Sequence, residues 1–266
     1  MKKYTDINAG AIDSWNKEGW EWGIPMTHEQ FCRAKEGEWK ILLTPTKIMP
    51  RTWLPQSLKG LKILGLASGG AQQIPVFAAL GARCSVLDYS PSQIKSEIDV
   101  AAREGYEVEA IRGDMTERLP FDDETFDIIV HPVSNCYIKE VGHVFNECYR
   151  VLKRGGILVC GLDNGINYIT DDEVTIGNSL PFDPLENAEY MRKLEKDNDG
   201  VQFSHTMEEQ IGCQLKAGFR LTDIYEDTNG EGRLHELNIP TFIATRAVKE
   251  LSLIHISEPT RLDVIS

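Results

Sequence analysis

The chain has 266 residues, 41% of them hydrophobic, and a formal net charge of −13. This size supports one α/β domain with an added segment, and the acidic charge disfavours a nucleic-acid partner because a phosphate backbone would be repelled. No apolar run could span a bilayer and the first residues lack a signal core, so we expect a cytoplasmic protein with no membrane partner. The cysteines show no metal-ligand spacing, so no metal site is expected.

Residues 1–55 hold all of the tryptophans and contain helix-compatible pieces broken by glycine and proline. They lack the strand–helix alternation of the residues that follow, so we expect an N-terminal helical cap. Trp15, Trp20 and Trp22 suit either closure over a site or packing of the cap on the edge of a sheet. If they contribute to a pocket, a small acceptor is favoured over a protein side chain.

From residue 61 onward, short apolar segments alternate with helical patterns, which predicts a doubly wound α/β sheet. Ser90 suits an N-cap and Pro91 the first helical position, and Ile94, Ile98 and Ala101 have the spacing of a buried helix face. The helix that follows the fourth strand is expected to end at Gly155-Gly156. The predicted strands are 61–66, 83–88, 107–112, 126–130 and 157–160, and the predicted helices between them are 72–80, the helix opened by Ser90-Pro91, and 141–152.

The alternation stops after Asp163, and residues 164–205 form an acidic stretch that we predict to be a lid-like insertion in the domain 56–249. A helix over 206–217 and strands over 220–226 and 241–248 follow. Two consecutive strands without a helix between them predict an antiparallel pair at one edge of the sheet. Residues 250–266 carry no pattern, and are either a tail foreign to the fold or an ordinary terminal extension.

The turn after the first strand is the most informative segment. Small residues such as Ala67, Ser68 and Gly69 let the backbone approach a ligand, and the helix that follows offers free N–H groups. Asp88 closes the next strand roughly 20 positions later, where a carboxylate can accept hydrogen bonds from both hydroxyls of a ribose. The pattern predicts a nucleoside-binding βαβ unit.

This turn belongs to the first of six motifs that occur in order along the chain, at 63–70, 86–91, 113–115, 119–121, 125–130 and 147–156. Together they resemble the class I S-adenosylmethionine-dependent methyltransferases, and most of all the small-molecule enzymes related to the ubiquinone and menaquinone biosynthesis methyltransferases. The resemblance covers residues 60–163 well. It implies a Rossmann-like, seven-stranded, mostly parallel sheet with an antiparallel last strand, S-adenosyl-L-methionine as cofactor, and methyl transfer to a small-molecule acceptor by in-line displacement.

The resemblance also implies roles for single residues. The turn would pack against the cofactor, Asp88 would bind the ribose, and Asp114 with Met115 would hold the adenine. Gly65 stands where the family often has an acidic residue, and Ala67 where it often has glycine; Gln72 and Gln73 could supply replacement polar contacts. The predicted cofactor-binding residues are Ala67, Ser68, Gly69, Gln72, Asp88, Tyr89, Asp114, Met115 and His131.

His131, Asn135 and Tyr137 follow the fourth strand, at the edge where open α/β sheets bind ligands. His131 is a candidate base, but it could equally pack on the cofactor or lie in the core; Tyr137 is the second catalytic candidate. A non-catalytic S-adenosylmethionine-binding protein and a nicotinamide-dependent oxidoreductase remain as alternatives, although the turn lacks the glycine spacing of a dinucleotide site. The sequence leaves the acceptor atom and the oligomeric state open.

Overall fold

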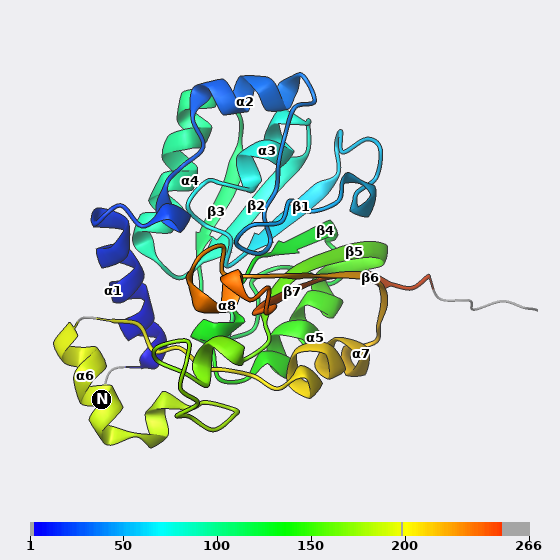
Figure 1. Cartoon of the computed structure of the whole chain (residues 1–266). Coiled ribbons are helices and arrows are strands. Elements are labelled where there is room, and N and C mark those ends of the chain that lie inside the picture. The colour runs from blue at the N-terminus through cyan, green and yellow to red at the C-terminus, as the bar shows by residue number, and fades with distance from the viewer. Residues whose placement is uncertain (1–2, 198, 252–266) are drawn as a thin grey trace, which may run out of the picture.

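A computed structural model describes residues 3–197 and 199–251. One seven-stranded sheet has the order β3-β2-β1-β4-β5-β7-β6, and β7 runs opposite to the other six strands (Figure 1). This confirms the predicted sheet with its antiparallel strand. The strands are β1 (Lys62–Leu66), β2 (Arg83–Asp88), β3 (Val108–Arg112), β4 (Phe126–His131), β5 (Leu152–Asp163), β6 (Phe219–Asp227) and β7 (Phe242–Lys249).

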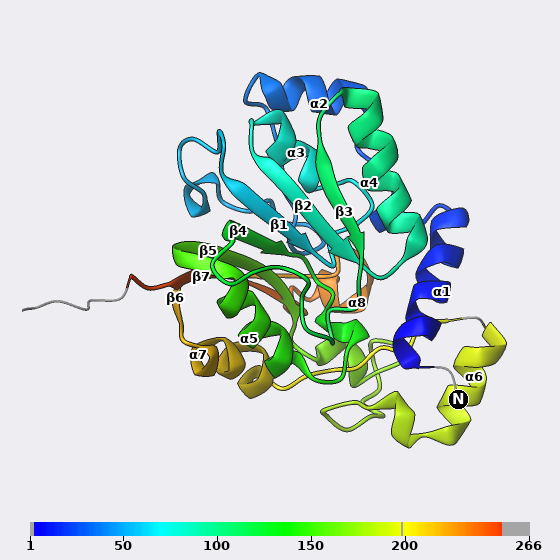
Figure 2. The same cartoon turned by 180° about the vertical axis from the view of Figure 1, so that it is seen from behind.

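Helices cover both faces of the sheet (Figures 1 and 2). Because side chains alternate along a strand, Ile63 packs with α3 and α4 on one face, and Leu64 packs with α5 on the other. This is the three-layer arrangement of a doubly wound fold. The helices are α1 (Tyr4–Lys17), α2 (His28–Lys35), α3 (Ile74–Ala79), α4 (Pro91–Glu104), α5 (Val141–Val151), α6 (Ala188–Asp197), α7 (Cys213–Ala217) and α8 (Gly232–Glu236).

Helix α4 begins as predicted, but its buried face is rotated. Ser90 accepts a hydrogen bond from the backbone N–H of Gln93, and Pro91 is the first helical residue. Ile98, predicted to be buried, is 50% exposed, so that part of the prediction is wrong. Glu97 is buried instead, because its Oε1 accepts the backbone N–H of Ala71 at 2.8 Å.

Helix α5 ends at Val151, before the predicted glycine stop, and β5 starts at once at Leu152. The carbonyls of Arg150 and Val151 accept the N–H groups of Glu124 and Thr125 at 3.0 and 2.8 Å. These bonds draw the end of the helix toward the loop before β4, where Leu152 pairs with Phe126 at the start of the sheet. The prediction of the helix end was therefore wrong because a neighbouring loop satisfies these two carbonyls.

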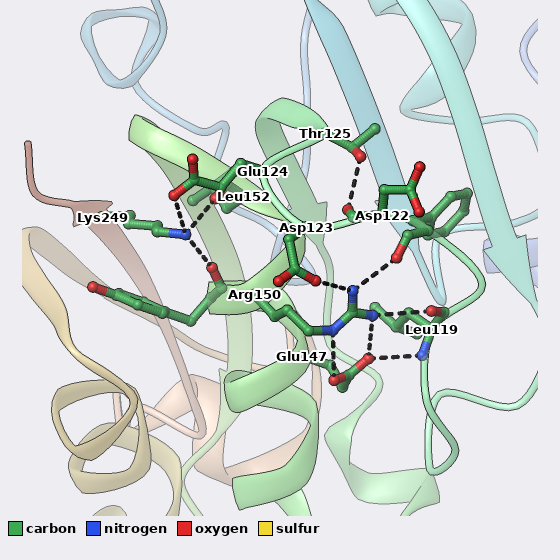
Figure 3. A network of polar contacts seen from close by, with 11 residues as sticks. Leu119, Asp122, Asp123, Glu124, Thr125, Glu147, Arg150, Leu152 and Lys249 are labelled. Atoms are coloured by element: carbon green, nitrogen blue, oxygen red, sulfur yellow. Dashed lines mark hydrogen bonds and ion pairs between the residues drawn. The ribbon is translucent and has the colours of Figure 1, made fainter.

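The Glu-x-x-Arg motif of α5 holds the loop that precedes β4 (Figure 3). Arg150 donates to both carboxylate oxygens of Glu147 at 2.9 and 2.6 Å, and to the carbonyl of Leu119 at 3.0 Å. Glu147 in turn accepts the N–H of Leu119 at 2.8 Å, and the hydrogen bonds from Arg150 lower the pKa of Glu147. The motif therefore has a structural role, fixing the loop between β3 and β4.

Residues before β1 and between β5 and β6 stand outside the sheet. The N-terminal segment contributes α1 and α2 and the short 3₁₀ turns Glu21–Gly23 and Arg51–Trp53, and residues 164–205 contribute α6. A π-helical turn, Glu208–Gly212, precedes α7, and α8 lies between β6 and β7, where no helix was predicted. The predicted tail 250–266 lies outside the described residues beyond Leu251. No helix of the described chain has the length and apolar character that crossing a bilayer requires.

Candidate active site

A cavity of about 490 Å³ lies at the carboxyl ends of the strands. Its lining includes residues 67–69 after β1, 88–90 at the end of β2, 113–115 after β3 and 132–134 after β4, together with Asp163 at the end of β5. Open α/β sheets bind their ligands at this edge. The structure thus brings the turn, the acidic strand end and the residues after β3 and β4 to one place.

The turn after β1 leaves no space for a side chain at Gly69. Its N–H donates to Asp88 Oδ2 at 3.0 Å. A Cβ on Gly69 would lie 2.5 Å from the Cβ of Gln93 and 2.8 Å from Asp88 Oδ2. Ala67 has a left-handed φ of 45° and donates its N–H to the carbonyl of Leu87 at 2.8 Å. The turn is thus fixed by its own backbone against β2 and α4.

The structure accounts for the glycine at position 65. A Cβ there would lie 2.8 Å from the side chain of Ile74, which is fully buried at the start of α3. An acidic side chain has no room in this packing. The two glutamines that follow the turn reach away from β1: Gln73 donates to the carbonyl of Leu42 at 3.2 Å, and Gln72 donates to the carbonyl of Glu21 at 2.7 Å. Both also line the cavity, and they tie the turn to the N-terminal segment.

Asp88 is held in place by backbone donors on both oxygens. Oδ2 accepts the N–H of Gly69, and Oδ1 accepts the N–H of Ser90 at 2.9 Å. Burial raises the pKa of Asp88 to about 6, and the two N–H groups only partly oppose this rise. Each carboxylate oxygen has further lone pairs, so the group can accept two more hydrogen bonds from a ligand in the cavity.

Asp114, Met115 and Tyr89 line the same end of the cavity. Asp114 Oδ1 accepts the N–H of Thr116 at 2.9 Å, and Oδ2 lies 2.8 Å from Lys3 Nζ. Burial alone would raise the pKa of Asp114, but the hydrogen bonds from Lys3 and Thr116 outweigh it and lower the pKa. Lys3 therefore occupies the carboxylate of Asp114, which was predicted to hold the adenine.

The two catalytic candidates lie in different places. His131 is completely buried, its Nδ1 lies 2.9 Å from the carbonyl oxygen of Leu66 and its Nε2 lies 2.8 Å from Asn135 Oδ1. It is not among the residues that line the cavity, whereas Tyr137 is. Burial raises the pKa of Tyr137 strongly. The structure thus brings Tyr137 to the predicted cofactor residues and leaves His131 beneath them.

Comparison with known proteins identifies the family. Residues 64–160 match the methyltransferase domain family. An S-adenosylmethionine-dependent methyltransferase from Mesorhizobium loti has the same fold, with a TM-score of 0.57 at 19% identity over 74% of this chain and 94% of that one. The uncharacterized methyltransferase YbaJ of Bacillus subtilis is 40% identical over 250 residues, which cover 91% of this chain and 97% of that protein. The chain belongs to the S-adenosylmethionine-dependent methyltransferase family.

A further relative of this methyltransferase is the ubiquinone biosynthesis O-methyltransferase of Maricaulis maris, 27% identical over 40% of this chain and 42% of that protein. The family's cofactor, S-adenosylmethionine, fits the residues present. The turn at Gly69 forms a cradle that a Cβ would fill. Asp88 lines the cavity, with both carboxylate oxygens oriented by backbone N–H groups, and so does Gln93, whose buried Oε1 has no hydrogen-bond partner among the described residues.

Much of the wall of this methyltransferase's cavity was not predicted. Asp163 could have been found, because it closes β5 as Asp88 closes β2. The other missed residues lie on α1, on α6 and in irregular segments, and no local pattern shows that these parts of the chain meet at the cavity. Of the tryptophans, Trp20 and Trp22 line the cavity and Trp15 does not. The missed lining residues include Thr5, Asn8, Leu42, Thr44, Asp163, Asn167, Tyr168, Asp171, Phe182, Tyr190, Asp199 and Gln202.

Proposed function

We propose that this protein transfers a methyl group from S-adenosylmethionine to a small-molecule acceptor bound inside the cavity. The observation that carries the proposal is the closure of the cavity by two segments outside the sheet. Asn8 of α1 donates to the carbonyl of Val201 at 3.0 Å and accepts the N–H of Val201 at 2.6 Å. Residues 1–55 and 164–205 thus act together as a lid, and a protein side chain has less access to such a site than a small molecule.

In this proposal the cofactor's nucleoside occupies the end of the cavity formed by β1, β2 and β3. Asp88 accepts hydrogen bonds from the ribose hydroxyls, with Tyr89 beside it, and Met115 packs on the adenine while Asp114 accepts from its amino group. Ala67, Ser68 and Gly69 present backbone along the cofactor, and Gln72 closes the turn. The support is that all of these residues line one cavity.

S-adenosylmethionine supplies the methyl group on a positively charged sulfur, so an acceptor in line with that bond needs chiefly to be positioned. Tyr137 is suited to position it, because it lines the cavity after β4. For His131 we propose a positioning role, because contacts on both ring nitrogens hold Asn135 against the end of β1. The missing acidic residue at 65 still favours a non-catalytic binding protein, and the packing of Ile74 explains only why no side chain fits there.

Calorimetric titration tests the proposal. We expect S-adenosylmethionine and S-adenosylhomocysteine to bind, NAD not to bind, and Asp88→Asn to weaken cofactor binding by about tenfold or more, since two charge-assisted hydrogen bonds are lost. Asp99→Asn, an exposed change in α4, is the matched control and leaves binding unchanged. Incubation with cell metabolites and a labelled methyl donor should yield a labelled small molecule. Binding without any labelled product would instead support a sensor.

A further inference from the structure

The charged side chains that line the cavity are all acidic. Five aspartates line it, and none of the described lining residues is Lys, Arg or His. Asp88 and Asp114 belong to the nucleoside end. Asp163, Asp171 and Asp199 form a second group. Asp163 ends β5, which is three strands from β2, so it lies about 14 Å from Asp88 across the sheet, and Asp171 and Asp199 come from the segment that follows β5.

Aromatic rings accompany the second group of aspartates. Tyr168 stacks on Phe182 with ring centroids 6.2 Å apart, and Phe182 meets Tyr190 edge to face at 5.3 Å. Asp171 and Asp199 line the same cavity as Tyr190, and their negative charges add to the effect of burial, which raises the pKa of Tyr190. We call the lid end the lining formed by Tyr137, Asp163, Tyr168, Asp171, Phe182, Tyr190 and Asp199.

We propose that the acceptor of this methyltransferase is a small amine, bound at the lid end as an ammonium cation between carboxylates and aromatic faces. The inference rests on the proposed function and names its substrate class. Carboxylates pair with ammonium groups, and the negative faces of aromatic rings attract cations within about 6 Å. A phenolate or carboxylate acceptor would face three like charges without a lining cation to offset them.

The lid end also offers a group that can take the proton of the amine. Asp163 is buried, and its oxygens accept from the N–H of Gly165 at 3.1 Å and from Gln210 Nε2 at 3.2 Å. Burial raises its pKa to about 6, opposed by the nearby His205, so it is a stronger base than an exposed aspartate.

The reaction then balances as follows. The ammonium group gives one proton to the carboxylate of Asp163, and the freed nitrogen lone pair forms the bond to the methyl carbon. The carbon–sulfur bond breaks, its electron pair stays on sulfur, and the product amine carries the positive charge. No metal is required by this step, and within the described residues no three His, Cys, Asp or Glu side chains lie close enough to hold one.

The test uses full-length protein saturated with S-adenosylhomocysteine, titrated with four probes of matched size: phenethylamine, N,N-dimethylphenethylamine, para-ethylphenol and phenylpropionate. We expect both amines to bind at least about tenfold more tightly than the phenol and the carboxylate. With labelled S-adenosylmethionine, the label should appear on the amine nitrogen. Failure of S-adenosylhomocysteine to bind contradicts the proposed function itself. Cofactor binding with no amine binding, or with equal binding of the phenol or carboxylate, overturns this inference alone.

Variants separate charge from packing. Asp199→Asn should weaken amine binding by about tenfold and leave S-adenosylhomocysteine binding within about twofold. Asp197→Asn, an exposed change at the end of α6, is the matched control and should alter neither. Tyr190→Phe should keep amine binding and Tyr190→Leu should weaken it, because only the former retains an aromatic face. Amine binding as tight as in the parent in both Asp199→Asn and Tyr190→Leu, with both variants folding normally, would overturn the proposal.

Discussion

The two ends of the cavity are built in different ways. At the nucleoside end, the backbone N–H groups of residues 67–71 donate hydrogen bonds to β2 and α4, and these bonds fix the turn. At the lid end, most of the lining side chains come from residues 164–205, which are held to α1 through Asn8 and a small apolar cluster around Leu194 and Phe203. We infer that the first end is preorganised for one constant ligand, whereas the second can vary its side chains without disturbing the sheet.

The largest expected effect on cofactor binding tests how rigid the nucleoside end is. Gly69→Ala places a methyl group 2.5 Å from the Cβ of Gln93 and 2.8 Å from Asp88 Oδ2. Because neither β2 nor α4 can easily move, we expect a loss of about 2 kcal/mol of stability and at least about tenfold weaker binding of S-adenosylmethionine. Thermal unfolding and calorimetry measure both.

Gly10→Ala in α1 is the matched control for this change, since a Cβ at Gly10 meets nothing within 4 Å. It should leave cofactor binding unchanged. Unaltered binding in Gly69→Ala would show that the turn adapts, and would remove the contrast between the two ends.

The difference between the nucleoside end and the lid end also explains which features the sequence could predict. The ends of β2 agree with the prediction residue for residue, and the nucleoside end follows from local patterns: an apolar strand, small residues and an acidic strand end. Ile98 and the end of α5 were misplaced because tertiary contacts decided them, namely the bond of Glu97 to Ala71 and the capture of the carbonyl of Val151 by Thr125.

The site residues also divide into those that local sequence patterns predict and those that tertiary contacts decide. The position of His131 in the sequence correctly predicted the edge of the sheet at which it lies. The direction of its ring is set by the carbonyl of Leu66 on the neighbouring strand β1, a contact that residue spacing in the sequence does not reveal. Most of the aromatic and acidic residues of the lid end come from loops and short turns, while Asp163 ends β5 and Tyr190 lies on α6, so no single local pattern could predict that they meet in space.

The second prediction concerns the buried acid beneath the turn. Burial raises the pKa of Glu97 from 4.5 to about 8, although the N–H of Ala71 opposes the rise. The folded state therefore holds a proton that the unfolded state releases, and stability falls as the pH rises from about 4.5 to about 8. Glu97→Gln keeps an oxygen for the N–H of Ala71 and removes this loss of stability, so we expect a gain on the order of 5 kcal/mol above that range.

Thermal unfolding across this pH range checks the prediction. The gain of Glu97→Gln should grow with pH and vanish in acid, where the glutamate is protonated in both states. Asp99→Asn on the exposed side of α4 serves as the control and should show no such slope. A variant that is less stable than the parent at every pH would mean that the carboxylate has a charged partner beneath the turn.

The third prediction concerns the attachment of the lid. Asn8→Ala leaves the N–H and carbonyl of Val201 and the carbonyl of Tyr137 without their buried partner, which costs about 1–3 kcal/mol. We expect faster amide hydrogen exchange at residues 199–203 and weaker acceptor binding, with S-adenosylmethionine binding unchanged. Ser14→Ala on the same helix is the control and should leave both hydrogen exchange and acceptor binding unchanged. An equal loss of cofactor and acceptor binding would mean that the two ends are not independent.

The smallest expected effect concerns the contact between the residue before α1 and the nucleoside end. Lys3 pairs with Asp114 and Glu117, and at 42% exposure its ion pairs are weak because water screens them. Lys3→Met frees Oδ2 of Asp114 for the adenine amino group, so we expect S-adenosylmethionine to bind about twofold more tightly, and Lys3→Arg to restore the parent affinity. The gain should disappear in high salt, which already screens the pair in the parent. Weaker binding in Lys3→Met would instead show that α1 must be tied to Asp114 for the nucleoside end to form, so that the preorganised turn depends on the lid.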